Sequence, residues 1–244
     1  MLLASTSMDP QREVDTLNAL AQRRIDALIL LLSYLDQSID LLQQLSAQQY
    51  SVVTLGFAVD NLDWVEAGFS NAMPQLMDHL FTLGHRRIGF VYGVGSPNMA
   101  TMRLRLFREA YHQHGFPFDE ALLMHCDKSM EDSYRATQAL LAIQPQPTAI
   151  ITVNDLLALG ALRAIHEAGL RVPQDVSVAA FDDIAMASYL TPPLTTVRAN
   201  AQEIGRQAAR LALARIQQPD LPVQTARVEA ELVVRASTGP APTT

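Results

Sequence analysis

Two polar residues follow short apolar runs at positions where they could hold a small molecule. Asn154 comes directly after the run 149–153, and Asp182 comes directly after the run 176–181. Both runs have the length and composition of buried strands. Ligands of open α/β sheets sit beyond the carboxyl ends of the strands. A carboxylate there can accept hydrogen bonds from two hydroxyl groups, and an amide can both donate and accept, so both side chains are candidates for a ligand-binding site.

Each of these residues also has a purely structural interpretation. Asn154 is well placed to cap a helix over residues 155–168. Asp182 and its neighbour Asp183 could be turn residues, with Asp183 capping the next short helix. Residue types and spacing leave both interpretations open.

The patterns typical of a metal site or an enzyme are missing from the sequence. The histidines include no HExxH motif, and His112 and His114 would point to different faces of a helix. Gly93-Val94-Gly95 after the run 88–92 could suggest a phosphate loop, but neither a full GxGxxG motif nor a Walker lysine follows, so a tight loop is the better interpretation. There is no GxSxG elbow and no defensible Ser-His-Asp arrangement. We therefore expect no catalytic residue, no metal and no cofactor.

Short apolar runs alternate with longer amphipathic segments along the chain, which predicts an α/β protein built from repeated strand–helix units around parallel sheets. The expected strands are 2–5, 27–32, 51–55, 64–66, 88–92, 122–125, 149–153, 176–181, 195–198 and a last one around 228–234. The expected helices are 10–24 with Asp9 as its cap, 36–48, 71–83, 102–114, 132–143, 155–168 and 200–217.

Length and composition favour a globular protein of two closely joined lobes. The 244 residues exceed a typical single domain, and no long polar spacer divides them. Hydrophobic residues make up 49% and charged residues 18%, which is far from the composition of a disordered chain. The longest strongly apolar run, 27–32, is too short to span a bilayer, and the N-terminus lacks the basic segment of a signal peptide. We expect no membrane association.

Charge and cysteine content narrow the partners and the compartment. The formal net charge of -7 argues against broad binding of a phosphate backbone, because such binding depends on clustered Lys and Arg. Cys126 is the single cysteine, so no disulfide can form within the chain. This suits a reducing cytoplasm, where we expect the protein, and Cys126 is expected to be a buried apolar thiol.

Four stretches together resemble the LacI/GalR family of repressors. They are LGHRRIG at 83–89, NDLLALG at 154–160, VPQDVSV at 172–178 with FDD at 181–183, and PLTTV at 193–197. Their order and separations also match the family, and similar strands and helices lie outside them. The resemblance therefore covers essentially the whole chain.

The resemblance implies a periplasmic-binding-protein type 1 fold. Such a fold has two doubly wound parallel-sheet lobes joined by three chain crossings, with a ligand in the cleft between the lobes. Mapping the family's crossings onto this chain gives an incomplete N-terminal lobe of 1–84 plus 198–220 and a C-terminal lobe of 85–197 plus 221–244.

Two departures from the family pattern stand out. Members begin with a DNA-binding headpiece, a hinge, and then a first strand and helix, whereas this chain opens at what resembles the second strand, 2–5. We expect the headpiece and one strand–helix unit to be absent, which would leave neighbouring strands with unpaired backbone groups and a hydrophobic gap. In the cleft, Ala67-Gly68 stands where members often carry Asp-Asn, and Lys128 lies near a position often filled by an aromatic ring.

The resemblance also adds candidate ligand-binding residues. Arg103 lies three residues before Leu106, where members usually have glycine, and so matches the family's effector arginine. A guanidinium can donate two parallel hydrogen bonds to vicinal hydroxyls or to a carboxylate. On spacing alone Arg103 could be a solvated helix arginine. Asn71 and Lys128 are candidates by position only, and a surface role is the simpler interpretation of both.

The expected function is that of the effector-sensing and dimerisation module of a LacI/GalR-type regulator. A small sugar or related metabolite would change the relative angle of the lobes in a homodimer and so control operator binding by a headpiece outside this chain. The alternative is a periplasmic sugar-binding protein of a transporter, which shares the fold. A sugar-modifying enzyme is a third interpretation, for which the sequence offers no catalytic residues.

Overall fold

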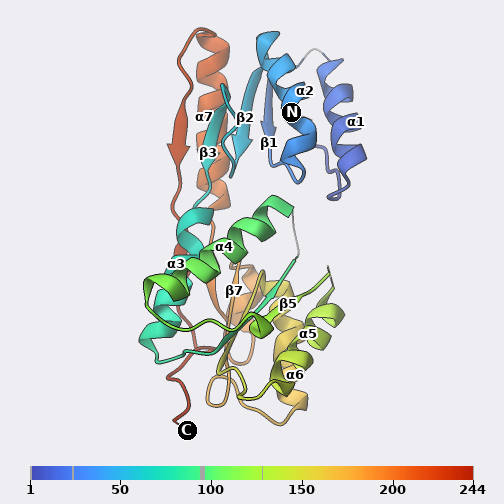
Figure 1. The fold of residues 1–244 in the computed structure, drawn as a ribbon. Coiled ribbons are helices and arrows are strands. Elements are labelled where there is room, and N and C mark those ends of the chain that lie inside the picture. The colour runs from blue at the N-terminus through green and yellow to red at the C-terminus, as the bar shows by residue number, and fades with distance from the viewer. Residues whose placement is uncertain (1, 24, 94–96, 128, 244) are drawn as a thin grey trace. The chain divides into compact units, whose positions relative to one another are not determined.

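The structure is a computed structural model that describes residues 2–23, 25–93, 97–127 and 129–243 (Figure 1). The chain forms two compact units. Unit 1 contains the residues up to Phe69, a short segment ending at Met99, and Asn200–Glu229. Unit 2 contains the segment that begins at Ser70, Ala100–Ala199 and the C-terminal segment from Ala230. The two doubly wound units confirm the predicted fold class, while the predicted lobe boundaries at 84, 197 and 220 stay a prediction.

Unit 1 is built on a four-stranded parallel sheet in the order β1-β2-β3-β9. Its strands are β1 (Ala27–Leu30), β2 (Ser51–Leu55), β3 (Asp63–Glu66) and β9 (Thr225–Arg227). Among the described residues β1 pairs only with β2 and so forms one edge of the sheet. Sequence reasoning missed β9, because three residues are too few to carry a period and this strand exists only through its pairing with β3.

Helices cover both faces of this sheet. They are α1 (Pro10–Ala21), α2 (Leu35–Ala47) and α7 (Ala201–Gln217). Neighbouring residues of a strand point to opposite faces: the Ser51 hydroxyl donates to the Ala212 carbonyl of α7, whereas Val52 packs in a cluster with Leu42 and Leu45 of α2. This is the doubly wound arrangement that the alternating sequence pattern predicts.

The N-terminal residues show where local patterns succeed and fail. Asp9 caps α1 as predicted, with its carboxylate accepting from the Arg12 N–H at 2.9 Å. The strand predicted at 2–5 is wrong, because this segment is a loop with Leu2 and Leu3 exposed. A strand needs a neighbour to satisfy its backbone groups, and this segment has no such partner among the described residues.

Unit 2 is built on a six-stranded sheet in the order β10-β8-β7-β6-β4-β5. Its strands are β4 (Ile88–Tyr92), β5 (Leu123–His125), β6 (Ala149–Thr152), β7 (Ser177–Phe181), β8 (Thr195–Arg198) and β10 (Glu231–Val233). All neighbours are parallel except β10 and β8. The carboxyl ends of β4, β6 and β7 therefore lie along one edge of this sheet, and the segments that follow them meet there.

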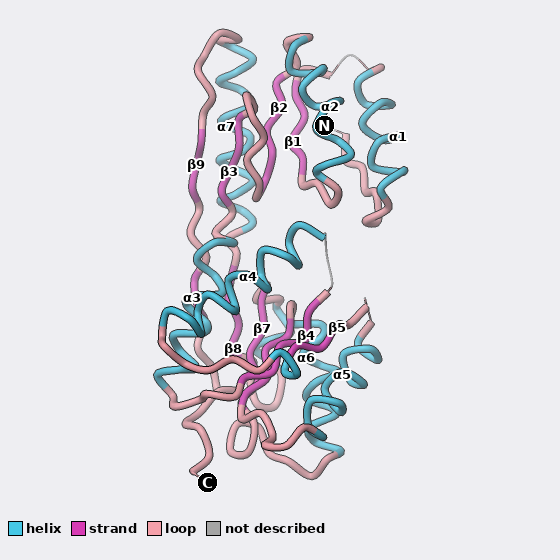
Figure 2. The backbone as a smooth tube through the Cα atoms, in the orientation of Figure 1, coloured by secondary structure: helices cyan, strands magenta, loops and turns pink. Residues whose placement is uncertain are grey.

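Two pairs of helices enclose the six-stranded sheet (Figure 2). They are α3 (Phe69–Thr82), α4 (Pro97–Gln113), α5 (Met130–Ala142) and α6 (Asp155–Glu167), with short 3-10 helices η1 (Glu120–Leu122) and η2 (Ala185–Tyr189). On one face Phe90 stacks on Phe107 of α4 with ring centroids 5.1 Å apart. On the other face a Cβ at Gly89 would lie 2.9 Å from Leu140 of α5. Glycine is thus needed at position 89 for α5 to approach the sheet.

A second glycine sets the contact between α5 and α6. A Cβ on Gly160 would overlap the Met130 carbonyl oxygen and lie 2.9 Å from the Tyr134 nitrogen. Both obstacles are backbone atoms, which cannot rotate away as a side-chain end would. Gly160 of the NDLLALG stretch therefore allows the close packing that holds the N-terminus of α6, and with it Asn154, in place.

Candidate functional site

The predicted site residues Asn154 and Asp182 lie on neighbouring segments of unit 2. Asn154 follows β6 and Asp182 follows β7, and these two strands pair in parallel. Both residues are therefore at the carboxyl edge of the sheet, where ligands of parallel α/β sheets bind. The tertiary structure brings together what the sequence placed 28 residues apart.

Asp182 is presented by a strained turn. Its φ is 109° and that of the following residue, Asp183, is 53°, and non-glycine residues adopt such angles at a cost in free energy. The Asp182 N–H donates to the Val197 carbonyl of β8 at 2.9 Å. Desolvation by surrounding protein atoms raises the pKa of the Asp182 carboxyl, and the charge of Arg103 opposes this shift.

Arg103 of α4 reaches the same edge. Its Nη1 donates to the carbonyl of Val153 at 3.0 Å, and its guanidinium lies over the ring of Phe181, 5.0 Å from the centroid. Burial lowers the pKa of Arg103, while the negative charge of Asp182 raises it. An arginine remains charged under such conditions. Its guanidinium carries five N–H donors in all, one of which binds Val153.

Asn154 is the N-cap of α6, as one of its two interpretations predicted. Its Oδ1 accepts from the Leu157 N–H at 2.9 Å. The cap uses the amide oxygen and leaves the NH₂ group, so a role as a donor to a ligand is compatible with this geometry. That ligand role stays a prediction.

Asn71 and Lys128 are the two remaining candidates from the sequence. Asn71 of α3 is engaged with the backbone of Ala230: its Nδ2 donates to the Ala230 carbonyl at 3.3 Å, and its Oδ1 accepts from the Ala230 N–H at 3.2 Å. Both atoms of the amide thus have a structural task. Lys128 lies outside the described residues.

Sequence reasoning missed a carboxylate beside this site. Asp155 is buried, with 1% of its surface exposed. Its Oδ1 accepts from the Thr196 hydroxyl at 2.6 Å and its Oδ2 from the Ile184 N–H at 2.8 Å. The only sequence signal was its place directly after Asn154, which is typical of an exposed first-turn acid.

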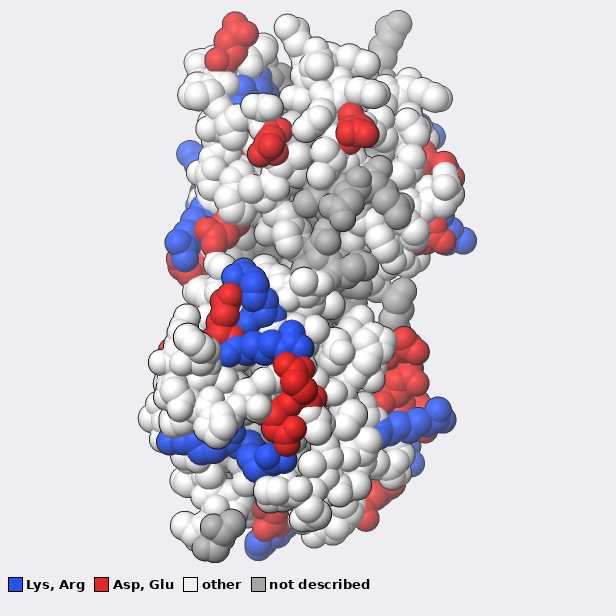
Figure 3. Space-filling model, in the orientation of Figure 1, with Lys and Arg blue, Asp and Glu red and all other residues white. Residues whose placement is uncertain are grey.

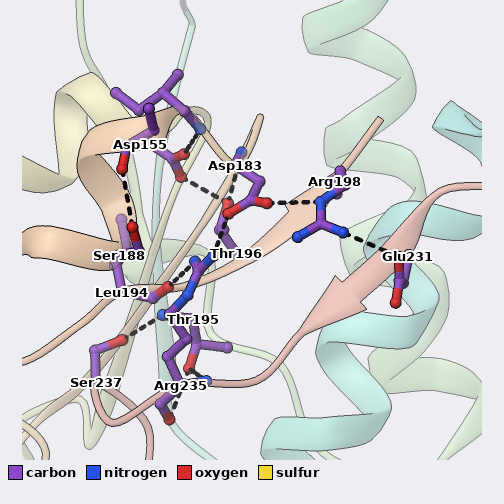
Figure 4. A network of polar contacts seen from close by, with 12 residues as sticks. Asp155, Asp183, Ser188, Leu194, Thr195, Thr196, Arg198, Glu231, Arg235 and Ser237 are labelled. Carbon is purple, nitrogen blue, oxygen red and sulfur yellow. Dashed lines mark hydrogen bonds and ion pairs between the residues drawn. The ribbon is translucent and has the colours of Figure 1, made fainter. Parts of the chain in front are cut away.

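Asp183 does not cap the short helix η2, although the sequence allowed that interpretation. The N-cap position of η2 is Ile184, and no side chain caps that helix. Asp183 instead pairs with Arg198 and Arg235, each at 2.6 Å (Figure 4). Burial raises the pKa of the Asp183 carboxyl, but the hydrogen bonds from Arg235 and Arg198 outweigh it and hold the pKa below its usual range. The cap interpretation of Asp183 is therefore wrong.

The site can bind a polar molecule by hydrogen bonds and charge. It offers a carboxylate, a guanidinium beside the Phe181 ring, and an amide N–H group from Asn154. Within the described ranges, no group of three or more His, Cys, Asp or Glu side chains could hold a metal ion. Cys126 is buried as predicted, and burial raises the pKa of its thiol to about 11, which keeps it protonated and unreactive at neutral pH.

A cavity of about 220 Å³ lies elsewhere, in unit 1, with Asp63 and Arg215 among the residues that line it. These two side chains bind each other in two contacts of 3.0 and 2.7 Å, and Arg215 also donates to three backbone carbonyls. Their polar groups are satisfied within the protein. We therefore place the candidate site at the carboxyl edge of the unit 2 sheet, where Arg103 and Asp182 meet.

Surface charge gives no sign of a nucleic-acid interface in this view of the molecule. On the face drawn in Figure 3, basic side chains lie beside acidic ones. The ion pairs Arg105–Glu109 at 2.8 Å and Arg108–Glu120 at 2.7 Å also join opposite charges on and beside α4. In the described part of the chain no helix is both long and apolar enough to cross a bilayer.

Comparison with known proteins identifies relatives of this chain. The model of the periplasmic binding protein-like domain matches residues 77–238. The HTH-type transcriptional repressor PurR of Haemophilus influenzae is 32% identical over 241 residues, which are 97% of this chain and 71% of PurR.

Solved structures of transcriptional regulators are also similar to this chain. A LacI family transcriptional regulator from Enterococcus faecium with bound ribose is 29% identical, with a TM-score of 0.81 over 93% of this chain and 84% of that protein. The complex of the transcriptional regulator CelR with cellobiose is 29% identical, with a TM-score of 0.82 over 94% of this chain and 71% of that protein.

Proposed function

Because the chain belongs to the LacI family of transcriptional regulators and covers the effector-binding part of that family, we propose that it binds a small sugar or a related metabolite through Arg103, Asn154 and Asp182. The binding of this effector would then regulate transcription. The periplasmic transporter alternative is not favoured, since the relatives are repressors and regulators of transcription. We propose a binding protein and not an enzyme.

One observation carries the proposal. Asp182 and Arg103 both reach the carboxyl edge of the unit 2 sheet, where Arg103 lies over the Phe181 ring and the charge of each residue shifts the pKa of the other. A carboxylate that accepts and a guanidinium that donates can together hold the vicinal hydroxyls of a sugar. The ribose and cellobiose bound to the two similar structures support this class of effector.

The test is binding of D-ribose and cellobiose to the 244-residue chain, measured by isothermal titration calorimetry and by thermal unfolding. A ligand present at a hundred times its Kd stabilises the folded protein by about 2.7 kcal/mol, so at least one sugar is expected to raise Tm. Binding without consumption of the sugar supports the proposal. Turnover of the sugar would favour an enzyme, and no binding of either sugar would contradict the proposed effector class.

We further propose that DNA is contacted by a helix-turn-helix segment outside these 244 residues and that the protein acts in the cytoplasm. The HTH-type names of the curated relatives and the 71% of PurR that this chain spans support that arrangement. The net charge of -7 makes DNA binding by the present chain itself unfavourable. Salt-sensitive binding of duplex DNA by the 244 residues alone would contradict the proposal that a segment outside them contacts DNA.

Homodimerisation through unit 2 completes the proposal. Three large apolar side chains are exposed on neighbouring segments of that unit: Leu156 at the start of α6, and Met186 and Tyr189 in η2. Tyr189 is 85% exposed. A contiguous exposed apolar surface marks a protein interface, and we propose that these side chains contribute to such a surface, which a second copy of the chain would present as well.

Replacing Tyr189 with aspartate is expected to shift the protein from dimer to monomer in sedimentation velocity, because a charge would be buried without a partner at the interface. Leu213→Asp on α7 is the control, since Leu213 is also exposed but lies in unit 1. A Tyr189→Asp variant that remains a dimer while Leu213→Asp dissociates would move the interface to α7.

A further inference from the structure

The turn between β7 and η2 needs outside support. Two consecutive non-glycine residues, Asp182 and Asp183, have positive φ angles. Such conformations persist only where the surrounding structure holds them. The turn carries the proposed effector carboxylate, so whatever holds it also sets the position of that carboxylate.

Asp155 holds this turn from within the protein. Its Oδ2 accepts from the N–H of Ile184, directly after the turn. Its Oδ1 accepts from the hydroxyl of Thr196, whose Oγ1 in turn accepts from the N–H of Asp183 at 3.3 Å. One buried carboxylate thus connects α6 to the turn and to β8 (Figure 4).

The residue type matters for this task. A carboxylate has two oxygens, and here each accepts from a different donor, whereas an asparagine side chain has one acceptor oxygen. Asparagine at position 155 could accept from the Ile184 N–H or from the Thr196 hydroxyl but not from both. With its oxygen on Ile184, its NH₂ group would face the Thr196 oxygen, which already accepts from the Asp183 N–H. With the Thr196 hydroxyl and the Ile184 N–H both as donors, Asp155 acts here as the ionised acid.

We propose that Asp155 is a positioning residue for effector recognition, which fixes the turn that presents Asp182 and does so as a carboxylate. This rests on the proposed function, in which Asp182 binds the effector. Asp155 itself is buried and is not expected to touch the effector.

The charge of Asp155 costs the protein stability. The pKa of this carboxyl is raised to about 6. Burial raises the pKa most, the hydrogen bonds from Thr196 and Ile184 lower it, and the charges of Asp182 and Asp183 also raise it. Asp183 is itself paired with Arg198 and Arg235, and Asp182 interacts with Arg103.

A group whose pKa is higher in the folded state stabilises the fold when protonated. For Asp155 this stabilisation is lost as the pH rises through about 6. At pH 7.5 the ionised acid is retained at a cost, as expected of a functional group.

The experiment compares Asp155→Asn with wild type and with Asp175→Asn. Asp175 is a matched control in unit 2, because its carboxylate also accepts a backbone N–H, that of Arg171 at 2.8 Å. Amide hydrogen exchange of Asp183 and Ile184 is measured by NMR, and D-ribose affinity is measured by calorimetry between pH 5 and pH 8. Tm is recorded at pH 7.5.

In Asp155→Asn we expect exchange at Asp183 and Ile184 to be faster and D-ribose affinity at pH 7.5 to be weaker, each by roughly tenfold for the loss of one hydrogen bond to a charged group. Tm at pH 7.5 should not fall. The ratio of wild-type to variant affinity should approach one toward pH 5, because wild-type Asp155 is then protonated. Asp175→Asn should match wild type in exchange and in affinity.

Unchanged exchange at Ile184 in Asp155→Asn would overturn the proposal, and so would faster exchange with unchanged D-ribose affinity or an affinity ratio that is independent of pH. A fall in Tm at pH 7.5 without a change in binding would assign Asp155 a structural role only. If wild type binds cellobiose but no D-ribose, the same comparison is made with cellobiose. If it binds neither sugar, the recognition role falls together with the proposed effector class, while the exchange rates still decide whether Asp155 holds the turn.

Discussion

Replacing Asp182 with asparagine or alanine is expected to abolish sugar binding and to leave the stability of the protein nearly unchanged. The carboxylate would accept two hydrogen bonds from sugar hydroxyls, and bonds to charged groups contribute about 1.5–3 kcal/mol each. Their loss corresponds to a weakening of Kd by at least about a hundredfold. Isothermal titration calorimetry with D-ribose and cellobiose measures this change.

The stability half of this prediction follows from the sign of the pKa shift. The pKa of Asp182 is raised by desolvation, so the protonated form favours the fold, and this contribution is lost as the pH rises through the folded-state pKa. At pH 7.5 a neutral side chain is expected to be at least as stable as the carboxylate. Asparagine is the better variant for Tm, since it tolerates the positive φ of this position more readily than alanine does.

Asp60→Asn serves as the control for Asp182→Asn. Asp60 is an exposed acid in a turn of unit 1 and lies outside the proposed site. Equal loss of sugar binding in both variants would point to a general charge effect. Full binding by Asp182→Asn would remove Asp182 from the site.

Replacing Asp63 with alanine is expected to produce the largest loss of stability, about 3–5 kcal/mol for a buried ion pair that loses one partner. Asp63 accepts two hydrogen bonds from Arg215 and one from the Gln224 N–H at 2.8 Å, and its side chain is 1% exposed. The hydrogen bond with Asp63 raises the pKa of Arg215 despite burial. Without Asp63, a guanidinium charge would remain inside unit 1 with only backbone carbonyls around it.

Urea denaturation measures the loss in the free energy of unfolding, and amide exchange then shows whether the loss falls on unit 1. The matched control is the exposed pair Glu203–Arg206 on α7, the helix that also carries Arg215. Glu203→Gln should change the stability of the protein little. The double variant Asp63→Leu with Arg215→Met should recover much of the lost stability, because it removes both charges. Similar losses in Asp63→Ala and Glu203→Gln would show that the buried pair contributes no more than a surface pair.

The sequence by itself determined the elements whose signals are local. The apolar runs of β4, β6 and β7 and the caps of α1 and α6 depend on residues within one turn or one strand, so their patterns were sufficient. The same runs indicated that Asn154 and Asp182 each directly follow a strand, and the tertiary structure decided that these two strands are neighbours. Arg103 was identified only because the chain resembles a known family, since its spacing did not distinguish a ligand from a solvated arginine.

Only the tertiary structure decided the features that depend on distant partners. The predicted strand at 2–5 does not form although its run is apolar, and β9 forms beside β3 although its three residues carry no strand pattern. Asp155 takes its two hydrogen bonds from residues 29 and 41 positions away, and Asp183 pairs with Arg235, which is 52 positions away. Hydrogen bonds and ion pairs form between groups a few ångströms apart in space, whatever their separation along the chain. The periodicity of the sequence therefore does not show which aspartate and glutamate side chains will be bound in this way.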